Sequence, residues 1–192
     1  RSKPEDIGWD WWSDRGRGGG LLGALGSHAV DSLRIWLGEP ERVFCNLLTF
    51  VKEREHQEVT SDDSFIMMLE FASEARAVIH MSAVSGVEES QIGIYGSEGQ
   101  LTLPGYKCID ISGGKRSGKK VQKLTIPARY ELAKEPGPFL RAPFRVLINS
   151  LVSAIDHNLK SPSPNFKDGL ANQAILDSAR RSFEESRWID LT

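Results

Sequence analysis

The spacing of apolar residues changes twice along this chain. Over residues 21–37 they recur at the helical spacing, and Gly38 follows as the expected C-terminal cap. From residue 43 to residue 95 the apolar runs are short and either alternate with polar residues or are rich in β-branched ones, as in strands. Two further helical stripes occupy residues 144–155 and 170–183. The pattern therefore predicts a helix, a succession of strands and two closing helices.

The expected strands lie close together, with no helix between them. They cover residues 43–52, 64–71, 75–84 and 91–95, then a hairpin strand after Gly99, a pair around the loop 113–120, and a terminal strand at 187–191. A doubly wound parallel sheet needs helices between its strands, so this order predicts an α+β fold. We expect an open, mostly antiparallel or mixed β-sheet with helices packed on one face. The uncovered face favours a homodimer or homotetramer.

Composition restricts the class of protein. A chain of 192 residues with 40% hydrophobic and 26% charged residues is typical of a soluble domain with one sizeable core, so we predict a single domain over residues 1–192. The net charge of −2 argues against nucleic acid or a membrane surface as a partner. Cys45 and Cys108 lie in strand-like runs, which predicts two reduced thiols and a cytoplasmic location.

Two glycine-rich segments imitate nucleotide-binding motifs. Gly18, Gly20 and Gly23 have the G-x-G-x-x-G spacing, but the charged run "WDWWSDRGR" precedes them where a dinucleotide site needs an apolar strand. The segment "GGKRSGKK" at 113–120 lacks the Ser or Thr of a P-loop and precedes a strand instead of a helix. We interpret the first as a glycine-rich helix start and the second as a hairpin loop.

His28 and Asp31 are the candidates for chemistry. On the predicted helix they share a face with Ala24, away from the main apolar stripe. A histidine of ordinary pKa in a cleft can pass a proton at neutral pH, whereas the alternative is a surface histidine bonded to the carboxylate one turn later. The other histidines are scattered, so we predict no metal site. Three nearby tryptophans suit either a surface that a substrate or domain covers, or a lid on the chain's own core: they are Trp9, Trp11 and Trp12.

Three segments resemble one known family. The run "GGGLLGALGSHAVDSLRIWLGEPERV" resembles the opening of the C-terminal domain of the Gfo/Idh/MocA oxidoreductases. "IYGSEGQLTL" is similar to the strand–G-x-x-G–strand hairpin of that family, and "DGLANQAILDSARRSFEESRWIDL" to its closing helix and last strand. The resemblance runs in the family's order from about Trp9 onward.

The resemblance implies a role for the whole chain. Members of this family are two-domain enzymes that move a hydride between NAD or NADP and a sugar, polyol or related carbonyl compound. Their N-terminal Rossmann domain binds most of the cofactor and supplies a catalytic lysine, and neither of its motifs is found here. We therefore expect this chain to be the C-terminal domain alone, a substrate cleft wall and oligomerisation sheet whose isolated form turns nothing over.

The resemblance also implies roles for single residues. His28 matches the family histidine that contacts the reacting hydroxyl or relays its proton, and Asp31 matches the aspartate one turn later. We take Trp9, Trp12, Arg15 and Asp31 as candidate substrate-binding residues. Ala24 stands where the family often has an aspartate. This departure keeps open an alternative class, a non-catalytic regulator or scaffold of the same fold that senses a ligand or cofactor.

Overall fold

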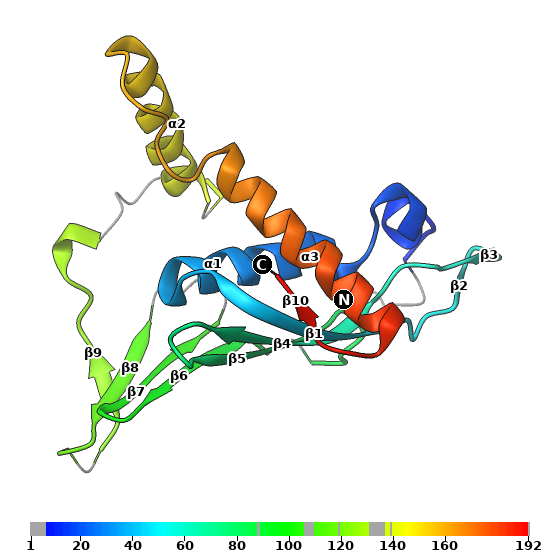
Figure 1. Cartoon of the computed structure of the whole chain (residues 1–192), viewed down its shortest axis with the longest axis horizontal. Helices are drawn as coiled ribbons and strands as arrows, with labels where there is room; N and C mark the ends of the chain where they lie inside the picture. The colour runs from blue at the N-terminus through cyan, green and yellow to red at the C-terminus, as the bar shows by residue number, and fades with distance from the viewer. Residues whose placement is uncertain are drawn as a thin grey trace. The chain divides into compact units, whose positions relative to one another are not determined.

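A computed structural model describes residues 7–87, 89–105, 110–118, 120–130, 137–138 and 140–191. The chain divides into two compact units (Figure 1). The first unit comprises Arg1–Gly86 and Ser163–Thr192, and the second comprises Val87–Pro162. Within the described residues, no helix combines the length and apolar character needed to cross a membrane.

The sheet of the first unit has the strand order β10-β1-β4-β5. The strands are β1 (Pro40–Leu48), β4 (Ser64–Phe71), β5 (Arg76–Ser82) and β10 (Ile189–Asp190), and every pair is antiparallel. The predicted antiparallel α+β class and the terminal strand are confirmed. β1 ends before the predicted residue 52 because the carboxylate of Asp63 accepts the backbone N–H groups of Phe50 and Val51 at 2.9 and 2.8 Å, which takes this segment out of the ladder.

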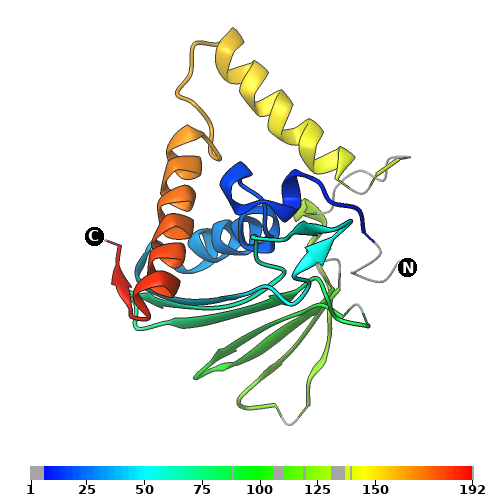
Figure 2. The same cartoon turned by 90° about the vertical axis from the view of Figure 1, so that its right-hand side faces the viewer.

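Two helices cover one face of this sheet (Figure 2). They are α1 (Ser27–Leu37) and α3 (Phe166–Glu185). Side chains alternate across β1, so that Val43, Cys45 and Leu47 are buried under the helices. Burial raises the pKa of the Cys45 thiol to about 12, which keeps it protonated. Cys108 lies outside the described residues.

A five-residue π-helical turn, Leu22–Gly26, leads into α1. Its start is fixed by Asp62, whose carbonyl accepts the Leu21 N–H at 2.9 Å and whose Oδ2 accepts the Leu22 N–H at 2.7 Å. A Cβ on Gly26 would lie 3.0 Å from Cζ of Phe65, so a glycine here lets the helix approach β4 closely. The predicted cap is confirmed, since the Gly38 N–H donates to the Arg34 carbonyl at 2.9 Å.

Shorter elements precede and follow β1. Two 3₁₀ turns, η2 (Trp11–Ser13) and η3 (Arg15–Arg17), come before the π-helical turn. A small hairpin of β2 (Glu53–Arg54) and β3 (Gln57–Glu58) follows β1. The sequence did not predict this hairpin because most of its residues are charged and carry no apolar alternation.

The second unit contains its own antiparallel four-stranded sheet, in the order β6-β7-β8-β9. The strands are β6 (Gln91–Gly96), β7 (Gly99–Pro104), β8 (Ile111–Lys115) and β9 (Gln122–Leu124), and a 3₁₀ turn η5 (Ala128–Tyr130) and the helix α2 (Arg141–Asp156) follow. The pair expected around residues 113–120 is confirmed with a shorter loop, because Gly113 and Gly114 lie within β8. Figure 1 labels the four strands and α2.

Candidate functional site

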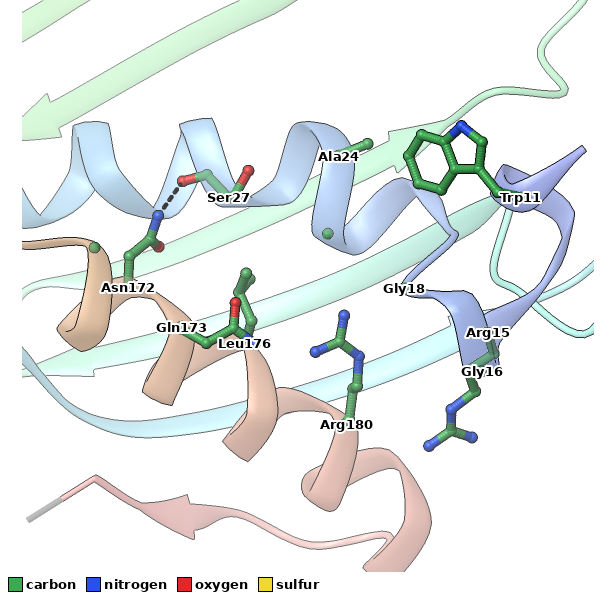
Figure 3. Close-up of a pocket in the computed structure, with 12 residues that line it drawn as sticks. Trp11, Arg15, Gly16, Gly18, Ala24, Ser27, Asn172, Gln173, Leu176 and Arg180 are labelled. Atoms are coloured by element: carbon green, nitrogen blue, oxygen red, sulfur yellow. Dashed lines mark hydrogen bonds between the residues drawn. The ribbon is translucent and has the colours of Figure 1, made fainter. Parts of the chain in front are cut away.

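A groove of about 580 Å³ opens in the first unit between the helix start and α3 (Figure 3). Three parts of the chain line it, namely the segment of the two 3₁₀ turns, the beginning of α1 with its π-helical turn, and one face of α3. The lining residues are Trp11, Arg15, Gly16, Gly18, Gly23, Ala24, Ser27, Gly169, Asn172, Gln173, Leu176 and Arg180. Four are glycines, so much of the wall is bare backbone.

The α3 wall consists of residues at helical spacing. Asn172, Leu176 and Arg180 follow one another at intervals of four and therefore share a face of the helix. Nδ2 of Asn172 donates to the Ser27 carbonyl at 3.1 Å, which ties α3 to the first turn of α1. Its Oδ1 is buried and has no hydrogen-bond partner among the described residues. This bond joins the two helices at one end of the groove.

Arg180 places a guanidinium in the groove. Its Nη1 donates to Oδ1 of Asp177 at 3.0 Å. Figure 3 shows the group pointing from α3 toward the segment that carries Gly18 and Ala24. A Cβ on Gly23 would lie 3.5 Å from Nη2, an ordinary contact distance, so the guanidinium lies directly beside the helix start. The charge also reaches Asp62, where burial raises the carboxyl pKa and Arg180 partly opposes that rise.

Arg15 and Trp11 form the opposite side of the groove. The Arg15 backbone N–H donates to Oγ1 of Thr60 at 3.0 Å, and its guanidinium pairs with Glu184 near the end of α3. Trp11 is half exposed, with its ring centroid 6.1 Å from that of Trp12. Of the candidate substrate-binding residues, the structure thus brings Arg15 to the groove.

Trp9 and Trp12 lie outside the set that lines the groove. The indole Nε1–H of Trp9 donates to the Glu58 carbonyl at 3.0 Å, which fastens it to the β2–β3 hairpin. Trp12 is partly buried and packs against the main core. The packing of Trp12 fits the alternative in which the tryptophans cover the chain's own core, and a substrate role for Trp9 or Trp12 stays a prediction.

His28 is exposed on α1 beside the groove. Ala24 and Ser27 of the same helical stretch line the groove, and His28 does not. Within the described residues its ring makes no hydrogen bond, so the carboxylate of Asp31 does not hold it. The predicted catalytic role of His28 stays open, with the imidazole accessible from solvent.

Asp31 belongs to a cluster around Arg34. Its Oδ1 lies 3.4 Å from Nη1 of Arg34, and Arg34 also binds Glu39 through two hydrogen bonds of 2.8 and 2.6 Å. The same guanidinium donates to the Asp168 carbonyl at 2.9 Å. The hydrogen bond to Glu39, opposed by burial, raises the pKa of Arg34. Asp31 thus lies in a cluster that joins α1 to the start of α3, and its substrate role stays a prediction.

The glycine-rich helix start does not fit a dinucleotide. The N–H groups of Leu21 and Leu22, which would bind a pyrophosphate, already donate to Asp62. A Cβ on Gly19 would lie 2.2 Å from the Trp12 carbonyl oxygen, so close backbone packing explains that glycine. Among the described residues, no three His, Cys, Asp or Glu side chains gather as a metal site would require.

Comparison with known proteins gives the family. Residues 1–102 match the model described as the GFO/IDH/MocA C-terminal domain. The chain belongs to the Gfo/Idh/MocA family. Relatives in this family include an oxidoreductase of Synechocystis, 28% identical over 94% of this chain and 52% of its own length. Glucose-fructose oxidoreductase domain-containing protein 2 of Xenopus laevis is also 28% identical, over 96% and 53%.

Solved structures of other proteins share the fold. Levoglucosan dehydrogenase in complex with NADH and L-sorbose superposes with a TM-score of 0.84 at 20% identity, over 100% of this chain and 55% of that one. An NAD binding oxidoreductase from Klebsiella pneumoniae gives 0.80 at 24% identity, over 98% and 55%. The chain thus spans about half the length of the relatives it matches.

Sequence reasoning did not select several groove residues. Trp11 was noted only as one of three tryptophans, and Ser27, Asn172, Gln173 and Arg180 were not singled out. One signal was available, because Asn172 and Arg180 are polar residues eight positions apart and hence on one face of the predicted last helix. The sequence does not show which helix that face meets.

Proposed function

We propose that this chain is the substrate-binding and oligomerisation domain of an NAD(P)-dependent oxidoreductase that acts on a sugar, polyol or related carbonyl compound. Family membership supports the oxidoreductase class. The name of the neighbour with bound NADH and L-sorbose supports the cofactor and substrate classes. The observation that carries the proposal is the groove itself, which opens at the turn of the helix that bears His28.

NAD or NADP would be held mainly by the N-terminal Rossmann domain, since the glycine-rich helix start of this chain does not fit a pyrophosphate. The nicotinamide ring of such a cofactor accepts or donates a hydride. The residues of this chain bind and orient the substrate. In this proposal, Arg15 contacts the substrate in the groove, and Trp9, Trp12 and Asp31 remain candidates for substrate contacts.

His28 holds or moves the proton of the reacting hydroxyl in this proposal. Its imidazole is exposed on α1 and has no hydrogen-bond partner among the described residues, so a substrate hydroxyl can approach it from solvent. A positioned acid or base of this kind contributes a factor of about 10²–10⁴ to the rate.

The test uses the full-length enzyme. Sugars and polyols are screened with NAD and with NADP, and His28→Ala is compared with His157→Ala, which changes an exposed histidine at the end of α2 in the second unit. We expect His28→Ala to lower kcat by about 10²–10⁴ and His157→Ala to leave it unchanged. Turnover that survives His28→Ala would remove this residue from the mechanism. The 192-residue chain alone should show no turnover.

Ala24 favours a second candidate, a regulator or scaffold that senses a ligand or cofactor without chemistry. It lines the groove with a methyl group, which neither orients a sugar hydroxyl nor relays a proton. Calorimetry on the same full-length protein separates the two classes. Binding of a sugar or of NAD(P) with no turnover of any substrate in the screen would favour the regulator.

We also propose that the sheet of the first unit mediates self-association. The face opposite the helices carries Leu48, Ile66 and Val78, which are 40, 43 and 70% exposed. Exposed apolar side chains on neighbouring strands form a patch of the kind that marks protein–protein contacts.

A further inference from the structure

The groove has an uneven charge. Among the described residues that line it, the charged ones are Arg15 and Arg180. On the helix start, Gly23 lies next to the Arg180 guanidinium and Ala24 lines the groove nearby, and all the remaining lining residues are uncharged. Two guanidinium groups therefore border a cavity whose other walls offer no compensating charge.

The nearby carboxylates do not use every N–H donor of the Arg180 guanidinium. Asp177 is 63% exposed, and of the Arg180 nitrogens it binds Nη1 alone. Its Oδ1 also accepts a hydrogen bond from Nε2 of Gln173 at 2.8 Å. Oδ2 of Asp62 accepts the Leu22 N–H. Nη2 of Arg180 has no hydrogen-bond partner among the described residues, although a guanidinium binds an acid group best through two parallel N–H donors.

The pair of Arg15 with Glu184 lies at the rim. Its two side chains are 45 and 53% exposed, and ion pairs so open to water contribute little. An anion entering the groove can therefore compete for Arg15 at small cost. Arg180 is 24% exposed, so its field inside the groove is less screened than that of Arg15.

We propose that the groove binds the acid group of an anionic substrate, so that the sugar or polyol turned over by this enzyme carries a carboxylate or a phosphate. Arg180 binds the acid oxygens and Arg15 adds positive charge at the rim. This inference rests on the proposed function for its sugar-like substrate. It assigns to Arg180 the choice between charged and neutral substrates.

Two further groups suit the rest of such a molecule. Trp11 is 50% exposed and offers an aromatic face, against which the C–H groups of a sugar ring can pack. Gln173 donates to Asp177 through Nε2, which leaves its amide oxygen available for a substrate hydroxyl. The groove therefore combines an acid-binding group, an apolar wall and a hydroxyl acceptor.

The first experiment follows the side-chain N–H signals of Trp11 and Arg180 by NMR in the full-length protein. The probes are D-gluconate, D-glucose 6-phosphate and neutral D-glucitol, at equal ionic strength. We expect at least one of the two acids to shift both signals in a saturable manner. Its dissociation constant should be at least tenfold lower than that of D-glucitol. Which acid does so identifies a carboxylate or a phosphate as the group bound.

Variants test the role of Arg180. Arg180→Gln should abolish the acid-induced shift of the Trp11 signal, and Ala24→Asp, which adds a carboxylate to the groove, should weaken it at least tenfold. Arg181→Gln is the matched control, because Arg181 is the next residue of α3 and pairs with Glu185 at 3.1 Å outside the groove. Circular dichroism confirms that each variant is folded.

The outcomes separate this inference from the proposed function. Equal shifts with D-glucitol and both acids, or an unchanged acid response in folded Arg180→Gln, would overturn the anionic-substrate inference and leave the oxidoreductase proposal standing. Acid binding that depends on Arg180, in a full-length protein without turnover, would support the inference while the proposed function fails.

Discussion

At the scale of single residues, the hydroxyl of Ser182 joins three segments of the first unit. It accepts the Cys45 N–H at 3.0 Å and donates to the Arg187 carbonyl at 2.6 Å. β10 is only two residues long, so the β1 backbone beyond it needs another acceptor, and α3 supplies one. Ser182 is fully buried, so no water replaces these bonds if they are lost.

We predict that Ser182→Ala lowers the free energy of unfolding by about 1–3 kcal/mol, because it leaves a buried N–H without an acceptor. Urea unfolding measures the change. Ser150→Ala on α2 is the control, since that exposed hydroxyl only bonds back to the Val146 carbonyl, and it should change stability by less than about 0.5 kcal/mol. Equal losses in the two variants would contradict this account of Ser182.

Residues differ in how far the sequence reveals their place in the site. Arg15 is among the candidate substrate-binding residues predicted from the sequence, and it lines the groove. Arg180 was not predicted, because nothing in its local sequence shows that its helix packs beside residues 11–27. Its place in the groove depends on segments far apart along the chain, since Gly23 and Arg180 both line it.

At the scale of elements, two aspartates hold the starts of the two helices that border the groove. Asp62 accepts the Leu22 N–H, and Asp168 accepts the Asn165 N–H at 2.8 Å within a capping box at the start of α3. The helices were predicted from apolar spacing, but the π-helical turn and the carboxylate from residue 62 were not. Both depend on a segment that reaches the helix only in the folded chain.

The stability of Asp62→Asn relative to the wild type should increase as pH rises. Burial raises the pKa of Asp62, so the folded state binds a proton more tightly than the unfolded state. The contribution of Asp62 to the stability of the wild type therefore decreases from about pH 4, the ordinary aspartate pKa, up to the raised pKa. Above the raised pKa this contribution is constant. Asparagine keeps an acceptor and does not titrate. Urea unfolding from pH 4 to pH 8 measures the difference between the two proteins.

Asp168→Asn should behave in the opposite way. The hydrogen bond from the Asn165 N–H, then that from the Ser163 hydroxyl, lowers the pKa of Asp168. Its stabilisation is therefore present above the ordinary aspartate pKa and is lost as pH falls through the lowered value. The variant should be less stable than the wild type at pH 7 and approach it below pH 4. If the stability of both variants relative to the wild type changed in the same direction as pH rises, the assigned causes would be contradicted.

At the scale of the whole molecule, the antiparallel strands and the helices on one face of the first sheet followed from the order of apolar patterns. The division of the strands between two units did not, because strand patterns do not state which neighbours pair. The uncovered face of the first sheet is the feature with the clearest consequence for assembly.

Val78→Glu should convert a dimer or tetramer into a monomer, because it places a charge at the most exposed apolar position of that face. Light scattering at micromolar concentration measures the mass. Val121→Glu, at a 51% exposed position of the second unit, is the control and should leave the assembly intact. A monomeric wild type would contradict self-association through this sheet.

The pairing of β1 with β10 also bears on how the chain acquires its shape during synthesis. The Cys45 N–H bonds to Ser182, which lies 137 positions further along the chain. By contrast, the strands β6, β7, β8 and β9 pair with their neighbours in sequence. Contacts so distant form slowly. We therefore expect the nascent chain to form the sheet of the second unit first and to leave the outer edge of β1 unpaired until β10, which follows α3, has left the ribosome. Aggregation is most favoured in that interval.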